Sequence, residues 1–370
     1  MSGTSDFRRM DTLGMTPRVW LRCLSGAPGP IDRRYVTRAL GAGALSFVSA
    51  LATLFPQPDP AVSADELEVY FIIGHWRSGT TFLHHLLAVD PRFIPLPQSM
   101  AVFPHLHGTP LLRPTLRALK IDGEYRRLID NVLISPQAPM ELEYALAALT
   151  GESEYLGWTF PRNRRAYLKY LRAEPSALSR LTTRRWERAM VDITEGLASP
   201  RGIVLHKNPA STAAVDEIKA LFPRARFVFI YRDARDVYAS TMKMMRALTD
   251  AGTLQEDDDD AALSEYVLER YCVLHEAFLR RRAALPADDL VFVRFESLAE
   301  DPLASVRRIY RRFGHEPDED RFAPYIARTR GYKRNKHRPL EPRALSAVES
   351  RWRPIQRQLD ELYATQESRS

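Results

Sequence analysis

Residues 74 to 81 read G-H-W-R-S-G-T-T, a glycine-bounded segment whose residue types suit the binding of an anion. The two glycines have the spacing of the triphosphate loop G-x-x-x-x-G-K-[ST], but Thr80 stands at the lysine position and Thr81 at the Ser/Thr position. Backbone N–H groups at the start of a following helix would point at an anion. A kinase or ATPase needs the missing lysine to reach the β- and γ-phosphates. We therefore expect a single phosphate, with Arg77 and the two threonine hydroxyls as further donors.

Two further segments end in residues that bind anions. The run F-V-F-I-Y-R-D-A-R-D-V-Y-A-S places Arg232 directly after a strand and Ser240 about two turns into the next helix. A guanidinium and a hydroxyl make a good clamp for a phosphate dianion, although a salt bridge of Arg232 with Asp233 or Asp236 is the alternative. The run L-H-K-N-P-A places Lys207 at the end of another short strand.

The elements that must position these residues alternate between strands and helices. We expect strands at 68–73, 203–205, 226–230 and 290–295, and helices at 80–89, 213–222, 234–246 and 302–313. This alternation predicts an α/β fold with a P-loop-like parallel sheet flanked by helices. Ligands of such sheets sit outside the carboxyl ends of the strands, where all three segments fall.

The rest of the chain is expected to surround this sheet. Residues 1–65 are an N-terminal helical segment and linker, 66–345 the main domain, and 346–370 a C-terminal helix and tail. Residues 105–200 are poor in strand signals and predict a largely helical insertion on the acceptor side.

Composition narrows the class of protein. The 370 residues are 45% hydrophobic and 27% charged, with a net charge of +7, which excludes a disordered, collagen-like or disulfide-rich chain. The excess of basic residues suits an anionic substrate or a membrane surface, and no nucleic-acid motif supports a nucleic-acid partner. Cys23 and Cys272 cannot form a CxxC site. We expect a cytoplasmic protein, peripheral to the membrane if its N-terminal segment binds lipid, and no zinc-type ligand spacing is apparent.

One apolar stretch bears on the location of the protein. Residues 39–55 are apolar but shorter than the about 20 residues that a spanning helix needs. The stretch is either a helix packed on the body of the protein or an interfacial helix. In the second case residues 33–55 contact the membrane peripherally, with Arg33, Arg34 and Arg38 facing lipid phosphates.

The run R-S-G-T-T-F-L-H-H-L-L resembles the 5′-phosphosulfate loop of sulfotransferases that use 3′-phosphoadenosine 5′-phosphosulfate (PAPS). The closest resemblance is to the broad group with R-S-G-T-T loops, which includes bacterial and tyrosylprotein-type members. It implies that the 5′-phosphate and sulfate are held by Arg77, Ser78, Gly79, Thr80 and Thr81.

The other motifs agree with this family. The resemblance implies that Arg232 and Ser240 grip the 3′-phosphate and that Lys207, in an element similar to the family's K-x-P, lies near the sulfate. The family also closes the nucleotide with a late basic loop. Residues 326–343 resemble it loosely, with Tyr332 and Lys333 as cofactor-binding candidates, and a solvated basic segment is the alternative.

Sulfuryl transfer needs charge stabilisation and a base, and no metal is expected. Arg77 and Lys207 would stabilise the developing charge. Many relatives carry a Glu after the loop helix, where this chain has P-L-P-Q-S-M-A-V-F-P. Residues 136–144, P-Q-A-P-M-E-L-E-Y, resemble the acidic element of other relatives, which makes Glu141, and second Glu143, the candidate bases. At i, i+2 on a helix the two cannot both face one site.

The sequence thus predicts a PAPS-dependent sulfotransferase that leaves PAP, the desulfated nucleotide, as its second product. Its acceptor is expected to be a hydroxyl or amine of a small molecule, glycan or lipid. Two alternatives stay open: a small-molecule kinase on the same scaffold, and a non-catalytic protein that binds PAP, PAPS or a membrane.

Overall fold

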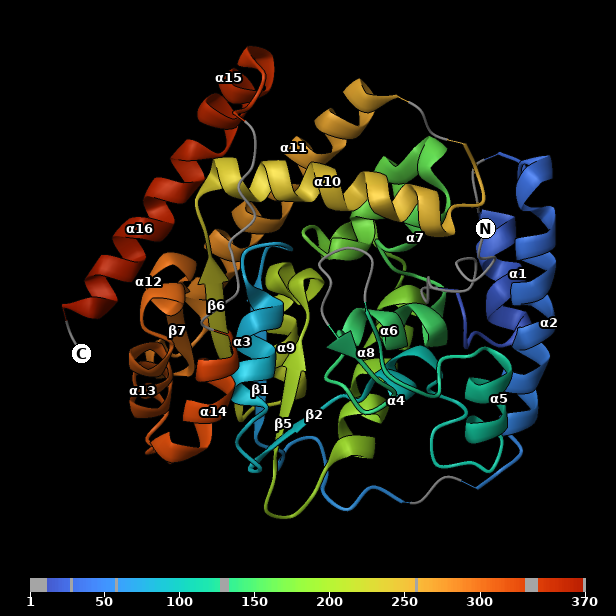
Figure 1. Ribbon diagram of the computed structural model, residues 1–370, viewed down its shortest axis with the longest axis horizontal. Helices are drawn as coiled ribbons and strands as arrows, with labels where there is room; N and C mark the ends of the chain where they lie inside the picture. Colours follow the sequence, from blue (N-terminus) through green and yellow to red (C-terminus); the bar gives the residue numbers. More distant parts are fainter. Residues whose placement is uncertain are drawn as a thin grey trace. The chain divides into compact units, whose positions relative to one another are not determined.

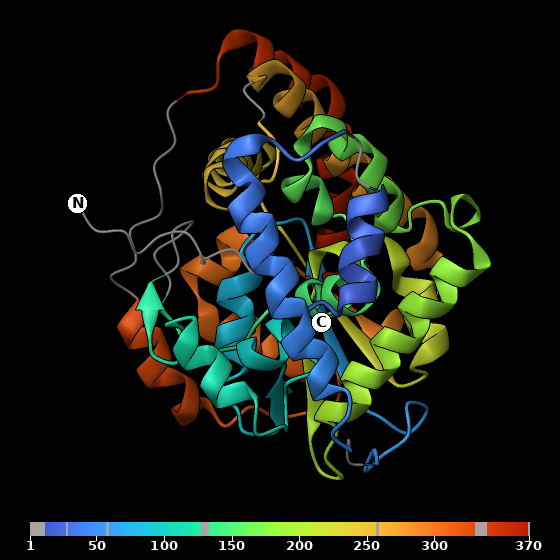
Figure 2. The ribbon, with the colours of Figure 1, turned by 90° about the vertical axis from the view of Figure 1, so that its right-hand side faces the viewer.

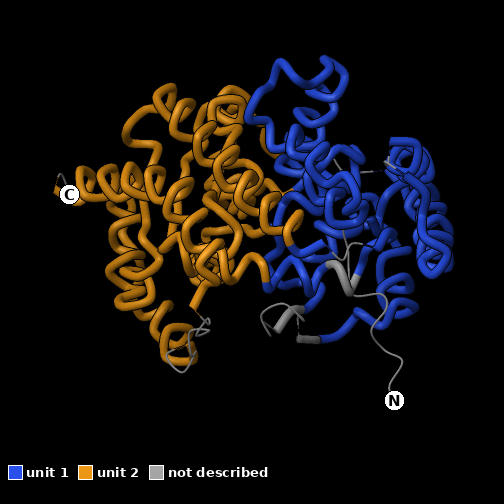
Figure 3. The backbone as a smooth tube through the Cα atoms, turned by 90° about the horizontal axis from the view of Figure 1, so that it is seen from above, with its two compact units in different colours: residues 1–60, 96–196, 243–260 blue, residues 61–95, 197–242, 261–370 orange. Residues whose placement is uncertain are grey.

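The computed structural model describes residues 12–26, 29–56, 59–126, 133–256, 259–329 and 339–368. The chain forms two compact units, each assembled from three stretches of sequence (Figure 3). Unit 1 comprises residues 1–60, 96–196 and 243–260, and unit 2 comprises residues 61–95, 197–242 and 261–370.

Unit 2 contains a five-stranded sheet in which all neighbouring strands pair in parallel (Figure 1). In spatial order the strands are β2 (Phe93–Pro95), β5 (Ile203–Lys207), β1 (Val69–Gly74), β6 (Ala225–Tyr231) and β7 (Leu290–Arg294). All six residues of the central strand β1 are buried, as expected where helices cover both faces. The carboxyl ends of β5, β1 and β6 are therefore direct neighbours.

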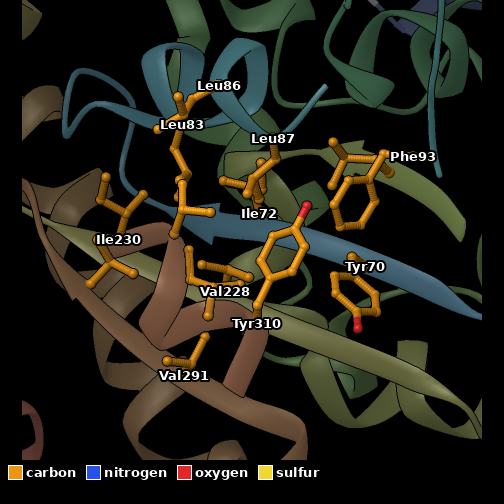
Figure 4. Close-up of a cluster of buried hydrophobic side chains, with 14 of the residues drawn as sticks. Tyr70, Ile72, Leu83, Leu86, Leu87, Phe93, Val228, Ile230, Val291 and Tyr310 are labelled. Atoms are coloured by element: carbon orange, nitrogen blue, oxygen red, sulfur yellow. The ribbon is translucent and has the colours of Figure 1, made fainter. Parts of the chain in front are cut away.

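One face of this sheet is covered by α3 (Thr80–Leu87), α13 (Pro302–Arg312) and α14 (Glu319–Thr329). The apolar residues of α3 lie on the side that meets the strands, as an amphipathic helix requires. The cluster between the two layers is drawn in Figure 4 and includes Tyr70, Ile72, Leu83, Leu86, Leu87, Val228, Ile230, Val291 and Tyr310.

Aromatic residues fill the other face. Phe71 of β1 stacks on Phe227 of β6, with ring centroids 5.8 Å apart. Phe229 of β6 stacks on Phe278 of α11 (Asp260–Arg281), with centroids 4.2 Å apart. Both faces of the sheet are thus packed with apolar and aromatic side chains.

The edge strand β7 is protected by α16 (Arg353–Glu367). The side-chain amide of Gln366 accepts a hydrogen bond from the N–H of Phe292 and donates one to the carbonyl of Leu290, each 2.8 Å long. These bonds occupy main-chain groups that an exposed edge would offer to another chain. The remaining helices of unit 2 are η4 (Pro209–Ala214), α9 (Val215–Leu221), η5 (Arg282–Ala284), η6 (Ala287–Asp289), α12 (Phe295–Glu300) and α15 (Pro342–Arg351). A long helix, α10 (Ala234–Gly252), begins in unit 2 and ends in unit 1.

Unit 1 is largely helical. Its helices are α1 (Pro17–Gly26), η1 (Arg33–Tyr35), α2 (Val36–Ala52), α4 (Gln98–Val102), α5 (Leu112–Ala118), α6 (Leu142–Thr150), α7 (Leu156–Thr159), η2 (Pro161–Leu171), η3 (Pro175–Ala177) and α8 (Arg180–Leu197). Its two short strands, β3 (Tyr125–Arg126) and β4 (Leu133–Ile134), pair antiparallel. Helices α1 and α2 lie side by side (Figure 2). Within the described ranges one helix, Arg33–Ala52, is long and apolar enough to cross a membrane, and 28% of it is buried.

The predicted fold class is confirmed, including the helical insertion and the N-terminal helices. The structure adds β2, which the sequence analysis missed because only three residues, the last of them a proline, form it. It also extends the helix expected to end near Arg246 as far as Gly252.

Candidate active site

The segment between β1 and α3 is held in a shape that only glycine permits at two points. Gly74 and Gly79 have φ values of +127° and +101°. A Cβ on Gly74 would lie 2.0 Å from the carbonyl oxygen of Ile230, and one on Gly79 would lie 2.3 Å from the ring of Phe295. Both separations are shorter than van der Waals contact. The loop can therefore pass this close to Ile230 and Phe295 only because glycine has no side chain.

Arg77 stands between these glycines in an unusual conformation. Its φ is +71°, a left-handed value that a residue with a Cβ adopts at an energetic cost and that clusters at functional sites. The Nε of Arg77 donates a hydrogen bond to Oγ of Ser240 over 2.9 Å. The structure therefore brings the phosphate-loop arginine into contact with the serine expected at the 3′-phosphate.

Ser78 stabilises the conformation of the loop. Its hydroxyl lies 2.7 Å from the carbonyl oxygen of His75 and 3.0 Å from that of Ile230, and its N–H also bonds to the His75 carbonyl. In the structure its donors are thus turned into the protein. Thr80 and Thr81 begin α3, where the first N–H groups of a helix have no partner within it.

Arg232 follows β6 as expected. Its Nη2 contacts Oδ2 of Asp236 over 2.6 Å, and its guanidinium carbon lies 4.7 Å from the centre of the Phe295 ring. The salt bridge considered as the alternative for Arg232 is therefore present. The side chain of Arg232 is only 12% exposed, whereas that of Asp236 is 47% exposed. The ion pair thus fixes a largely buried guanidinium at the edge of the sheet.

Lys207 ends β5 opposite Ile72 of β1 and is 3% exposed. The residues after it tie this strand to the loop. The N–H of Asn208 donates to the Ile72 carbonyl over 3.0 Å, and Oγ1 of Thr212 accepts from the N–H of Gly74 over 2.8 Å. Sequence reasoning missed Thr212, whose only signal was its place just after the K-x-P element.

Three neighbouring strands thus deliver the predicted anion-binding residues of unit 2 to one edge. Lys207 comes from β5, Arg77 and the loop from β1, and Arg232 and Ser240 from β6 and the helix after it. Glu296 accepts a hydrogen bond from the N–H of Asp233 over 3.2 Å and so fixes the turn that follows Arg232. Asp301 caps α13 by accepting from the N–H of Ala304.

The two candidate bases belong to unit 1 and differ in their surroundings. Glu141 is the residue before α6, with φ −78° and ψ 131°, and is 7% exposed. Glu143 lies within the first turn, and its carboxylate accepts a hydrogen bond from the hydroxyl of Ser153. Tyr332 and Lys333 lie outside the described residues.

Comparison with known proteins decides the family. Residues 70–320 match the model of the sulfotransferase family. The chain belongs to this family. The predicted resemblance is thereby confirmed, and the reaction of this chain is sulfuryl transfer.

Individual relatives agree with this assignment. Two curated family members, both named omega-hydroxy-beta-dihydromenaquinone-9 sulfotransferase Stf3, come from Mycobacterium bovis and Mycobacterium tuberculosis. Each is 31% identical over 291 residues, which is 77% of this chain and 73% of theirs. Among solved structures, sulfotransferase STF9 from Mycobacterium avium covers 93% of this chain and 97% of its own with a TM-score of 0.65 at 15% identity. STF1 from Mycobacterium tuberculosis covers 94% and 93%, with a TM-score of 0.59 at 21% identity. These two structures share the fold.

The glycine requirement can be tested with a matched pair. Gly314 also has a positive φ, +73°, but a Cβ there would meet nothing within 4 Å. Gly314→Ala should therefore lower the free energy of unfolding by about 1–2 kcal/mol, the cost of the left-handed conformation alone. Gly79→Ala should lower it by about 1–3 kcal/mol more, because the methyl group also displaces Phe295. Urea unfolding measures both, and equal losses would show that the loop does not depend on close approach at Gly79.

Proposed function

We propose that this sulfotransferase uses PAPS and transfers its sulfuryl group to a hydroxyl or amine. The observation that carries the proposal is the placement of three basic residues, Arg77, Lys207 and Arg232, at the carboxyl ends of three adjacent strands beside a glycine-bounded loop. Three cations at one edge suit a nucleotide that carries phosphate at both the 3′ and the 5′ position of its ribose. The kinase alternative lacks support because Thr80 stands at the position of the lysine that contacts the β- and γ-phosphates.

The donor would bind along this edge of the sheet. The amides at the start of α3, with Arg77, Thr80 and Thr81, would hold the 5′-phosphosulfate, and Ser78 and Gly79 would keep the loop in shape. Arg232 and Ser240 would hold the 3′-phosphate, which must share Arg232 with Asp236. Tyr332 and Lys333 would cover the nucleotide.

In the reaction the acceptor oxygen or nitrogen attacks sulfur in line. A new bond to sulfur forms as the bond between sulfur and the 5′-phosphate oxygen breaks, and the electron pair stays on that oxygen. Lys207 and Arg77 would stabilise the charge that develops there and on the sulfuryl oxygens. The acceptor proton passes to a carboxylate. This is Glu141 in our assignment, because it lies at the start of α6, with Glu143 as second choice. No step is assigned to a metal.

Donor specificity is the first test. PAP should bind at least about tenfold more tightly than AMP, a difference of about 1.4 kcal/mol, because AMP lacks the 3′-phosphate. In Arg232→Ala this difference should shrink. Arg235→Ala is the matched control, since Arg235 is half exposed and pairs with Glu349 over 2.7 Å. Calorimetry with the six protein–ligand pairs measures this, and equal affinity of the unaltered protein for PAP and AMP would refute the clamp.

The transfer step can be separated from binding. Lys207→Ala should lower kcat by about 100-fold or more while PAP affinity stays within a few-fold, as expected for a contact made mainly in the transition state. Lys243→Ala, at an exposed position of α10, is the control. If Lys207→Ala instead loses mainly PAP affinity, Lys207 is a binding residue.

The candidate base is tested separately. Glu141→Gln should lower kcat and remove the acidic limb of the pH–rate profile, whereas Glu143→Gln should keep that limb. If both Gln variants keep the limb, the base lies elsewhere.

For the acceptor we propose a lipid that carries a hydroxyl group, bound on the side formed by residues 105–200. The Stf3 relatives, which are named as sulfotransferases of a hydroxylated menaquinone, support a lipid. A screen with radiolabelled PAPS over an ω-hydroxylated isoprenoid quinone, phenols, glycans, glycolipids and steroids identifies the acceptor class.

The side chains of α2 support a membrane-peripheral location. The fully buried residues of α2 are all small: Ala39, Ala42, Ser46, Ser49 and Ala52. Leu45 and Val48 are partly buried against the core, but other large apolar side chains point outward, with Leu40 and Phe47 each 68% exposed and Leu51 50% exposed. Ordinary solvent-facing helices have the opposite arrangement. We propose that this outer face lies in the headgroup region of a bilayer.

The charges beside α2 fit an anionic surface only in part. Arg33 and Arg34 are exposed, and Arg34 also pairs with Glu256 over 3.0 Å. Arg38 is turned inward and donates to the Thr253 carbonyl over 2.8 Å. The apolar face should therefore contribute more to binding than the arginines, and salt should weaken binding only modestly.

Vesicle flotation tests this contact. The full-length protein should float with vesicles of phosphatidylcholine and phosphatidylglycerol, and Phe47→Ser with Leu51→Ser should weaken binding by about tenfold or more, because each large side chain contributes about 1.5–3 kcal/mol when fully buried. Leu181→Ser is the matched control, since Leu181 of α8 is 59% exposed. Unchanged binding of the double variant would refute the proposal. So would retention in the membrane after a carbonate wash, or a dimer formed through α2 without vesicle binding.

A further inference from the structure

His84 lies one helical turn beyond the phosphate loop, where the mechanism above gives it no role. Thr80, His84 and Leu87 follow each other at helical spacing on the buried side of α3, which packs on β1 and β5. His84 is fully buried, with none of its surface exposed. Its imidazole therefore sits behind the first threonine of the loop.

Among the residues that the structure describes, neither Nδ1 nor Nε2 of the His84 imidazole has a partner in hydrogen-bonding geometry. Burial, and after it the positive charge of Lys207, hold the pKa of His84 well below its usual range. His85 and His206 act in the same direction, and the Leu205 carbonyl acts in the opposite one. The ring is thus neutral and keeps a free lone pair beside the cation of Lys207.

Lys207 and His84 share one face of the sheet. Ile203 and Leu205 of β5 belong to the cluster that Leu83, Leu86 and Leu87 of α3 also enter. Since alternate residues of a strand face the same side, Lys207 follows them onto the α3 face. His206 points to the other face, where its ring lies 5.3 Å from that of Phe71.

This placement is unfavourable for stability. A buried polar group without a partner lowers the stability of the fold, whereas leucine would suit the apolar surroundings of α3. Unfavourable groups of this kind are found where function requires them. The geometry gives His84 one such use, because it lies one helical turn beyond the phosphate loop and on the face of the sheet that Lys207 shares.

We propose that His84 is a positioning residue for the transfer step. A neutral ring nitrogen of His84 accepts a hydrogen bond from the Lys207 ammonium, directly or through one water, when the donor nucleotide is bound. The bond directs the ammonium toward the oxygen that leaves sulfur. A neutral acceptor fits this task because it orients the cation and leaves its charge intact, whereas a carboxylate would cancel that charge. The inference rests on the proposed use of PAPS and on Lys207 as the cation at the leaving oxygen.

The test compares His84→Leu, His84→Asn and the control His206→Leu. His206 is also fully buried, but on the opposite face of β5, and burial lowers its pKa to about 3. The readouts are the melting temperature, PAP affinity, and the rate at which PAPS at saturation releases sulfate with water as the acceptor. Water removes any dependence on the identity of the natural acceptor.

His84→Leu should melt no lower than the unaltered protein and bind PAP within a few-fold. Its sulfate release should fall by about tenfold to a hundredfold, the range for losing one hydrogen bond to a charged group. His84→Asn, which keeps an acceptor atom, should recover most of the rate, and His206→Leu should leave it unchanged.

Other outcomes overturn the inference in distinguishable ways. Full activity of His84→Leu shows that the imidazole does not position Lys207. A lower melting temperature, with equal loss of activity in the Leu and Asn variants, shows a structural role. If the unaltered protein neither binds PAP nor releases sulfate from PAPS, the proposed function itself is wrong and the inference falls with it.

Discussion

The contact of the β1–α3 loop with the end of β6 is the constraint on which the site depends. Gly74 lies against the Ile230 carbonyl, Ser78 bonds to the same carbonyl, and Gly79 lies against Phe295. Two residues after Ile230 the chain reaches Arg232, whose guanidinium lies over the Phe295 ring. The loop and the arginine therefore share the same packing partners, and a displacement of one would carry the other with it.

Charge at this edge follows from the parallel order of the strands. A parallel sheet places the residues that leave β5, β1 and β6 beside one another, so cations far apart in sequence converge without long loops. Lys207 is almost fully buried and Arg232 is largely buried, which strengthens their attraction for an anion relative to exposed side chains. The exposed carboxylate of Asp236 holds Arg232 in position, and a bound phosphate must compete with it.

Sequence patterns predicted the parts of this site that are local. The glycine spacing, the strand before it and the arginine after β6 are each visible within about fifteen residues, and all lie at the expected edge of the sheet. What the sequence could not show is which partner each side chain chooses in the fold. The bond from Arg77 to Ser240 joins residues 163 positions apart, and the inward turn of the Ser78 hydroxyl depends on β6.

The same limit applies to residues that were missed or left open. Thr212 reaches Gly74 through a turn of 3-10 helix, and which side chains of α2 are buried and which are exposed appears only once its neighbours are placed. Apolar composition alone allowed both a packed and an interfacial helix. The exposure of Leu40 and Phe47 gives physical grounds for the second.

Amide hydrogen exchange of the full-length protein, with and without saturating PAP, tests the central claim most directly. The account predicts slower exchange with PAP in residues 75–82, where amides contact the 5′-phosphate, and in residues 232–240, where the 3′-phosphate is held. Protection confined to other segments, while PAP is bound, would contradict the assignment of the nucleotide to this edge of the sheet.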